Sequence, residues 1–108
     1  MLSGNDDETL SLMATGADGV ISVASNVDPQ RMVQLVEALK VDNMAEARQL
    51  HYRLMPLFKN CFVESNPIPA KAALAQLGLC ENSLRLPLVP ATPDTEQLMK
   101  ETLKDLEL

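Results

Sequence analysis

Hydrophobic residues in the first quarter of the chain predict a strand, a helix and a second strand. Residues 1–3 (MLS) and 20–23 (VISV) are largely apolar runs, and between them Leu10, Met13 and Ala14 lie three and four positions apart. An unbroken β-branched run such as VISV is typical of a strand buried on both faces of a parallel sheet. The segment is therefore predicted to form one βαβ unit.

The rest of the chain is predicted to be helical. Asp28 precedes a proline and can cap a helix, and Asn43 with Glu46 resembles a capping box. Further helices are expected at about residues 67–77 and after residue 92. The apolar stripes of the first, second and last of these helices comprise Met32, Leu35, Val36 and Leu39; Ala47, Leu50, Leu54, Leu57, Phe58, Cys61 and Phe62; and Leu98, Met99, Leu103 and Leu106.

This order of elements is unbalanced. One βαβ unit followed only by helices supplies two parallel strands, whereas a parallel sheet needs flanking strands and cover on both faces. We therefore expect the chain to be the end of a larger α/β protein.

Composition excludes several classes of function. The net charge is −6, and the nine basic residues are spread singly along the 108 residues, so no basic patch is available for nucleic acid. No apolar run approaches the length of about 18 residues that a membrane span requires. A zinc site would need more ligands than two cysteines, Cys61 and Cys80, and one histidine, His51. Both cysteines are expected to be reduced thiols, and the His51 ring is expected to be partly covered or solvent-facing. No metal is predicted.

Sites in α/β proteins form beyond the carboxyl ends of the strands. Here that rule selects residues 3–6 and 21–26, where Gly4 either lets the backbone approach a ligand or simply eases a tight turn. Ser3 and Ser22 lack a GxSxG elbow, which argues against a serine hydrolase. The helix is expected to be capped by Asn5, and the acidic run that follows is interpreted as a solvated charge cluster at the helix start, consisting of Asp6, Asp7 and Glu8.

Lys71 lies in a largely apolar stretch, VESNPIPAKAAL, and raises the possibility of an imine-forming amine. The alternative, which we favour, is scaffold. Asn66 is expected to cap a helix with Pro67 in its first position and Pro69 in its third, which places Lys71 in the second turn with its ammonium in water.

Four stretches of the chain resemble the dihydrodipicolinate synthase family of pyruvate-dependent class I aldolases: SGNDDETLSLMATGADGVISVASN, the helix AEARQL…RLMPLF, VESNPIPAKAAL and LRLPLVP. The resemblance covers essentially all of the chain. It implies a (β/α)₈ barrel with a helical C-terminal extension. MLS and VISV would be its last two strands, residues 1–42 the last βαβα part of the barrel and residues 43–108 the extension. The chain alone is then expected to be mostly α-helical.

The resemblance also implies a chemistry. In the family, pyruvate forms an imine with a lysine on the sixth strand, and the enamine attacks aspartate semialdehyde, on the route to diaminopimelate and lysine. The enzymes are cytoplasmic, are homo-oligomers (homotetramers) and need no cofactor. The imine lysine and its supporting residues are expected upstream of Met1, so no catalytic residue is predicted in this chain, which we expect to be inactive alone. Ile21 matches a residue whose backbone contacts the pyruvate-derived group, and Gly4 a glycine that lines the pocket.

Two alternatives remain open at this point. The parent enzyme is a related sugar-acid aldolase, similar to N-acetylneuraminate lyase, or the chain is a non-catalytic helical assembly module. VESNPIPAKAAL together with RLPL favours the synthase over the sugar-acid aldolases.

Overall fold

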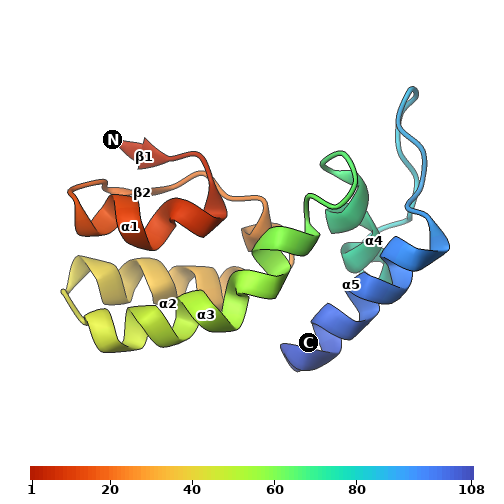
Figure 1. Ribbon diagram of the computed structural model, residues 1–108. Helices are drawn as coiled ribbons and strands as arrows, with labels where there is room; N and C mark the ends of the chain where they lie inside the picture. Colours follow the sequence, from red (N-terminus) through yellow and green to blue (C-terminus); the bar gives the residue numbers. More distant parts are fainter.

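The protein folds into two short parallel strands and five α-helices, so the prediction of a mostly helical chain is confirmed. The structure is a computed structural model that describes all of residues 1–108 (Figure 1). In chain order its elements are β1 (Leu2–Ser3), a 3-10 helix (Asp6–Glu8), α1 (Thr9–Ala14), β2 (Gly19–Val20), a second 3-10 helix (Ala24–Asn26), α2 (Pro29–Lys40), α3 (Met44–Asn60), α4 (Ile68–Gln76) and α5 (Pro93–Asp105).

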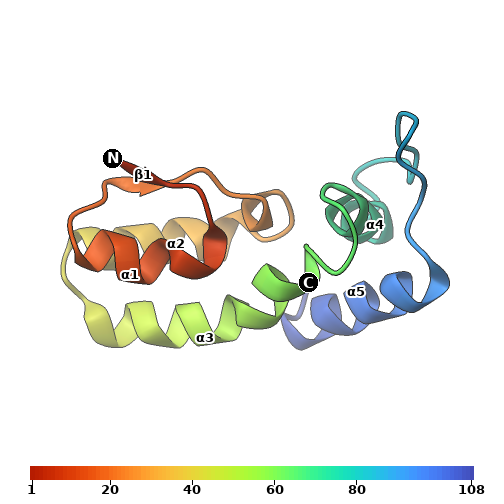
Figure 2. The ribbon, with the colours of Figure 1, turned by 45° about the horizontal axis from the view of Figure 1, so that its top comes forward.

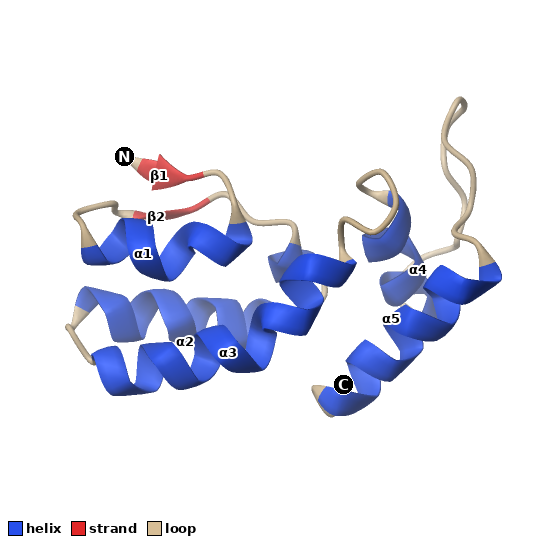
Figure 3. Ribbon diagram, in the orientation of Figure 1, coloured by secondary structure: helices blue, strands red, loops and turns tan.

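The two strands pair in parallel and α1 crosses between them, as predicted for a βαβ unit. Figure 3 shows the two strands side by side above α1. In their register Leu2 lies opposite Gly19, and Ser3 lies opposite Val20. A Cβ added at Gly19 would meet the end of the Leu2 side chain at 3.4 Å, which is van der Waals contact.

The prediction of a second strand over residues 20–23 was wrong in its length and burial. The strand ends at Val20, and the Ile21 side chain is 68 % exposed. Two physical reasons account for the difference. β2 has only one neighbouring strand. In addition, residues 24–26 form a 3-10 helix, and the N–H groups at its start donate to the side chain of Asp6, which lies in the loop after β1.

The predicted starts of α2 and α3 are confirmed. The Asp28 side chain accepts a hydrogen bond from the backbone N–H of Arg31, at 3.2 Å, and also bonds the Arg31 guanidinium at 2.8 Å. Asn43 accepts from the backbone N–H of Glu46 at 3.3 Å, and its amide donates to the Glu46 carboxylate at 3.0 Å. Both caps satisfy N–H groups that the helix itself leaves free.

The predicted cap of α4 was wrong. The helix begins at Ile68, the cap position is occupied by Pro67 rather than Asn66, and no side chain caps it. The Ile68 N–H instead donates to the carbonyl of Ser65 at 2.8 Å. Pro69 therefore stands second in the helix, where a proline costs no hydrogen bond.

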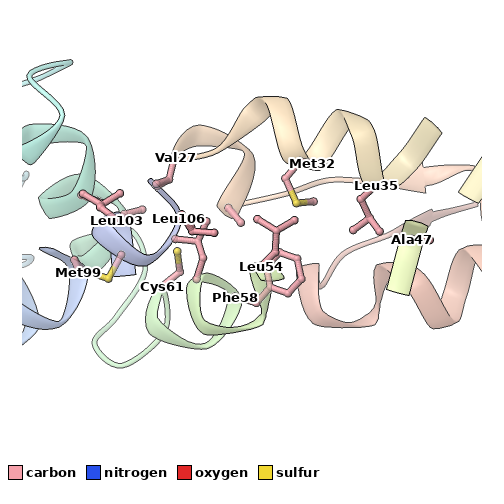
Figure 4. Packing of buried hydrophobic residues seen from close by; sticks show 14 of the residues in the cluster. Val27, Met32, Leu35, Ala47, Leu54, Phe58, Cys61, Met99, Leu103 and Leu106 are labelled. Atoms are coloured by element: carbon pink, nitrogen blue, oxygen red, sulfur yellow. The ribbon is translucent and has the colours of Figure 1, made fainter. Parts of the chain in front are cut away.

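A single core joins the two ends of this elongated molecule, which measures 40 × 27 × 20 Å. The strands, α1, α2 and most of α3 form one end, and α4 and α5 form the other (Figure 2). The buried residues Leu54 and Phe58 of α3, and Cys61 directly after it, belong to the same core as Met99, Leu103 and Leu106 at the other end (Figure 4). The buried core residues are Ala24, Val27, Met32, Leu35, Ala38, Leu39, Ala47, Leu54, Leu57, Phe58, Cys61, Ala70, Ala73, Met99, Leu103 and Leu106.

Candidate functional site

The carboxyl ends of the two strands lie at the same edge, as parallel pairing requires. The Ile21 N–H donates to the carbonyl of Ser3 at 2.9 Å. Gly4 and Ile21 therefore directly follow Ser3 and Val20, the last paired residues of the two strands. Both residues are exposed. No donor in the structure bonds the Ile21 carbonyl, and nothing lies within 4 Å of the place where a Gly4 Cβ would stand. This edge therefore presents open backbone to a ligand.

Ser3 and Ser22 shape the backbone and are not arranged as nucleophiles. The buried Ser3 hydroxyl donates to the carbonyl of Asn5 at 2.8 Å and accepts from the Asn5 N–H at 3.3 Å. The Ser22 hydroxyl accepts from the Ser25 N–H at 2.9 Å. Both are turn contacts of the kind serine makes beside the ends of strands and helices, and neither hydroxyl is hydrogen-bonded to His51.

Asp6 is a buried structural residue, so its interpretation as part of a solvated cluster was wrong. Its side chain is 4 % exposed, and one carboxylate oxygen accepts from the backbone N–H groups of Val23, at 3.0 Å, and Ala24, at 2.9 Å. Asp7 and Glu8 are exposed, as expected. Asn5 does not cap the first turn with its side chain, which corrects a second expectation.

Sequence reasoning missed the role of Asp6 because its partners lie 17 and 18 residues away. The one available signal was its place, three residues after a predicted strand and at the same edge as the N–H groups that follow VISV. A carboxylate at that edge can bond the loop of the neighbouring strand. Asp6 thereby sets the path of the chain directly after Ile21.

His51 is partly covered, as predicted. Its ring centroid lies 5.3 Å from that of Tyr52 and 6.2 Å from that of Phe58. Burial lowers the pKa of His51, while the charge of Asp7 acts in the opposite direction. The ring therefore favours its neutral form.

The two cysteines differ in environment, and both are free thiols. Cys61 lies in the core, where burial, and secondarily the negative charge of Asp6, raises its pKa to about 12. Cys80 is exposed in the connector between α4 and α5. Nowhere do three or more His, Cys, Asp or Glu side chains gather in a group fit to hold a metal ion, and no helix has the length and hydropathy that crossing a bilayer demands.

All five lysines of the chain lie on helices, and none on a strand. Lys71 is half-buried near the start of α4. It lines an open groove, whereas an imine-forming lysine needs an enclosed apolar pocket or a neighbouring cation to lower its pKa. The other four lysines are exposed on α2, α3 and α5, at Lys40, Lys59, Lys100 and Lys104.

Comparison with known proteins places these features in one family. Residues 1–106 match the Dihydrodipicolinate synthetase family. Among curated proteins, the 4-hydroxy-tetrahydrodipicolinate synthase of Thermosipho africanus is 52 % identical over 104 residues, which cover 96 % of this chain. The crystal structure of dihydrodipicolinate synthase from Thermotoga maritima superposes on 96 % of the chain with a TM-score of 0.95 and 52 % identity.

A third similar protein was solved with a ligand. The chloride-inhibited dihydrodipicolinate synthase of Acinetobacter baumannii, in complex with pyruvate, matches 98 % of this chain with a TM-score of 0.94 and 36 % identity. The chain spans only 36 % of the length of the Thermosipho relative, 35 % of the Thermotoga structure and 36 % of the Acinetobacter structure.

Proposed function

This chain belongs to the dihydrodipicolinate synthetase family, and on that premise we propose that it is the C-terminal segment of a lyase that condenses pyruvate with aspartate semialdehyde through a lysine Schiff base. In this proposal, β1 and β2 are the last two strands of a (β/α)₈ barrel, and residues 43–108 form the helical extension. The lysine that forms the Schiff base is contributed by a preceding strand, outside these 108 residues.

One observation carries the proposal: Gly4 and Ile21 expose backbone at the carboxyl edge of a parallel strand pair. Active sites of barrel enzymes lie at that edge. The Ile21 N–H is already bonded to the Ser3 carbonyl at 2.9 Å, so the free Ile21 carbonyl is the group left to face a ligand. Gly4 leaves space there because it has no side chain. We assign Ile21 to the pyruvate-derived group and Gly4 to the lining of its pocket.

The position of the lysines supports the view that the chain is inactive alone. An imine-forming amine must be desolvated so that its pKa falls and a neutral form attacks the carbonyl. Here the lysines lie on helices, exposed or half-buried, and none is at the strand edge beside Gly4 and Ile21. The Ser3 hydroxyl donates to the carbonyl of Asn5, and one carboxylate oxygen of Asp6 accepts from the backbone N–H groups of Val23 and Ala24, so both side chains hold the backbone at that edge.

The names of the relatives favour aspartate semialdehyde over a sugar acid as second substrate, since one is named a 4-hydroxy-tetrahydrodipicolinate synthase and two a dihydrodipicolinate synthase. The proposal extends to lysine and diaminopimelate biosynthesis, to a cytoplasmic location, and to a homo-oligomeric, tetrameric parent enzyme. No cofactor is required, because the imine itself is the electron sink.

A trapping experiment tests the claim of inactivity. The 108-residue chain is incubated with pyruvate and borohydride, and its intact mass is measured. We expect no stoichiometric adduct. A site-specific adduct on any of the five lysines would contradict the proposal.

Complementation tests the positive claim. The N-terminal part of the Thermotoga maritima synthase that this chain does not match is co-expressed with the chain, and condensation of pyruvate with aspartate semialdehyde is assayed. We expect activity only when both parts are present. Gly4→Ala is expected to raise the KM for pyruvate without unfolding the chain, because its Cβ meets no atom within 4 Å. Val41→Ala, at the exposed end of α2, is the control.

The alternative of a non-catalytic assembly module has one observation in its favour. Leu2, Ile21 and Val33 leave large apolar side chains exposed near the strands, which is typical of surfaces that pack against another segment. Complementation separates the alternatives: a complex that forms without activity supports the module, and an active complex supports the lyase.

A further inference from the structure

A groove between the start of α4 and the connector that precedes α5 carries only positive charge. It is lined by six residues: Pro67, Lys71, Ser83, Leu84, Arg85 and Leu88. The chain contains 15 acidic and nine basic residues, yet both charged side chains of the groove are basic. They come from segments 14 positions apart in sequence, so the fold, and not a local cluster, brings them to one groove.

Neither of these cations is neutralised within the chain. The four ion pairs of the structure use other groups: the N-terminus with Asp18, Arg31 with Asp28, Lys40 with Glu37, and Arg53 with Glu107. The side-chain hydrogen bonds in this part of the chain are those of Gln76 and Asn82 to Glu96, and neither involves Lys71 or Arg85. The groove therefore holds two unpaired positive charges and the hydroxyl of Ser83, all of which are donors.

The backbone contributes little to the same region. Pro67 and Pro69 have no N–H group, the Ile68 N–H donates to Ser65, and the Lys71 N–H donates to the Pro67 carbonyl at 2.8 Å. Of the first-turn N–H groups only that of Ala70, a buried residue, is left without a hydrogen bond, so an anion at this helix start meets fewer free N–H groups than at most helix N-termini. Side chains must supply the recognition.

We propose that this groove binds a small oxyanion of the phosphate class. The Arg85 guanidinium offers a planar fork for two oxygens, the Lys71 ammonium offers a mobile point charge, and the Ser83 hydroxyl offers a third donor. Three donors suit an anion with three or four oxygens better than a carboxylate, which has two. The apolar part of the lining is formed by Leu84 and Leu88, which are half-buried.

Binding at this place has a structural consequence. Leu84 and Leu88 pack against a small cluster made by Ile68, Ala72 and Ala91, which fixes the connector to α4. An anion held between Lys71 and Arg85 joins the same two segments. We therefore expect the bound anion to hold the connector, residues 79–92, more firmly against α4.

Titration with inorganic phosphate tests the proposal. Heats of binding are measured on the full 108-residue chain at low ionic strength, since surface charge interactions are screened by salt. We expect saturable binding with a Kd on the order of 1 mM or tighter, and weaker binding of acetate in a parallel titration. Lys71→Gln and Arg85→Gln are each expected to weaken phosphate binding by about tenfold or more, because each removes a charged hydrogen-bond donor.

Arg48→Gln is the matched control, since Arg48 is exposed on α3 and does not line the groove; it is expected to leave the phosphate affinity unchanged. Circular dichroism verifies that each variant is folded, and Arg85→Lys, which keeps the charge but not the fork, is expected to bind with intermediate affinity. Three results would overturn the proposal: no saturable phosphate binding, an equal loss in all three glutamine variants, or acetate binding as tight as phosphate.

Discussion

Asp6 and Ala24 are joined by a hydrogen bond of 2.9 Å, in which the buried carboxylate of Asp6 accepts from the backbone N–H of Ala24. The same oxygen accepts from the N–H of Val23 at 3.0 Å. The loop after β1 thus holds the chain that leaves β2. Because Ile21 lies between β2 and this contact, Asp6 fixes the direction of the backbone that we assign to ligand binding.

Removal of the Asp6 carboxylate is expected to destabilise the fold. Asp6→Ala leaves two backbone N–H groups unsatisfied, and we expect the free energy of unfolding to fall by about 1–3 kcal/mol. Asp6→Asn keeps one acceptor oxygen and should lose less. Urea denaturation followed by circular dichroism measures both, with the exposed Asp7→Ala as control. An equal effect at Asp6 and Asp7 would refute the role given to Asp6.

Truncation of a core leucine is expected to cost far more than truncation of an exposed residue on the same helix. Leu35 is fully buried in α2, whereas Val33 is 60 % exposed. Leu35→Ala should lower the free energy of unfolding by about 2–5 kcal/mol through lost burial and a cavity. For Val33→Ala a change within about 0.5 kcal/mol is expected. Thermal and urea denaturation of the two variants provide the comparison.

Only one of the two cysteines is expected to react with a thiol reagent in the folded protein. The thiolate is the reactive form, and burial raises the pKa of Cys61 to about 12. Cys80 is exposed. A disulfide reagent at pH 8 should therefore titrate a single thiol in the native chain and both in urea, and Cys80→Ser should abolish the native reaction. Fast reaction of two native thiols would contradict the burial of Cys61.

The raised pKa of Cys61 is also expected to make the fold less stable in alkali. Its folded pKa, about 12, lies above the ordinary value of 9.0, so the unfolded chain releases the proton first. The stabilisation is complete below pH 9 and declines as pH rises from 9 towards 12, by at most about 1.4 kcal/mol per pH unit. Cys61→Ala should lose this part of the pH dependence, as measured by urea denaturation at a series of pH values.

The lowered pKa of Glu64 is expected to make the fold less stable in acid. Hydrogen bonds from the Thr95 hydroxyl, and then from the Thr92 N–H, lower the pKa of Glu64 below its ordinary value of 4.5. The contact joins the loop after α3 to the start of α5. Its contribution is present above pH 4.5 and is lost as pH falls through the lowered pKa. Glu64→Gln should be less sensitive to acid than the unchanged chain in thermal denaturation between pH 3 and 6, a range chosen to bracket that value.

Part of the candidate site was predictable. The order of elements along the chain and the rule for parallel strands together put Gly4 and Ile21 at one edge, and the bond between Ile21 and Ser3 confirms that placement. Their contact with a pyruvate-derived group stays a prediction. The burial of Asp6 and the shared groove of Lys71 and Arg85 were not predictable, because each depends on segments that only the fold brings together.

The sequence by itself determined the local features of this protein. The caps at Asp28 and Asn43 bond N–H groups three residues ahead, so the neighbouring residues alone decide them, and the helical stripes follow from a period that any helix imposes. Tertiary structure alone decided where the second strand ends, which carboxylate is buried, and which residue begins α4. These outcomes depend on solvent exclusion and on hydrogen bonds between segments that are well separated in the chain. A short stretch of sequence does not contain both partners of such a contact, so it cannot predict the contact.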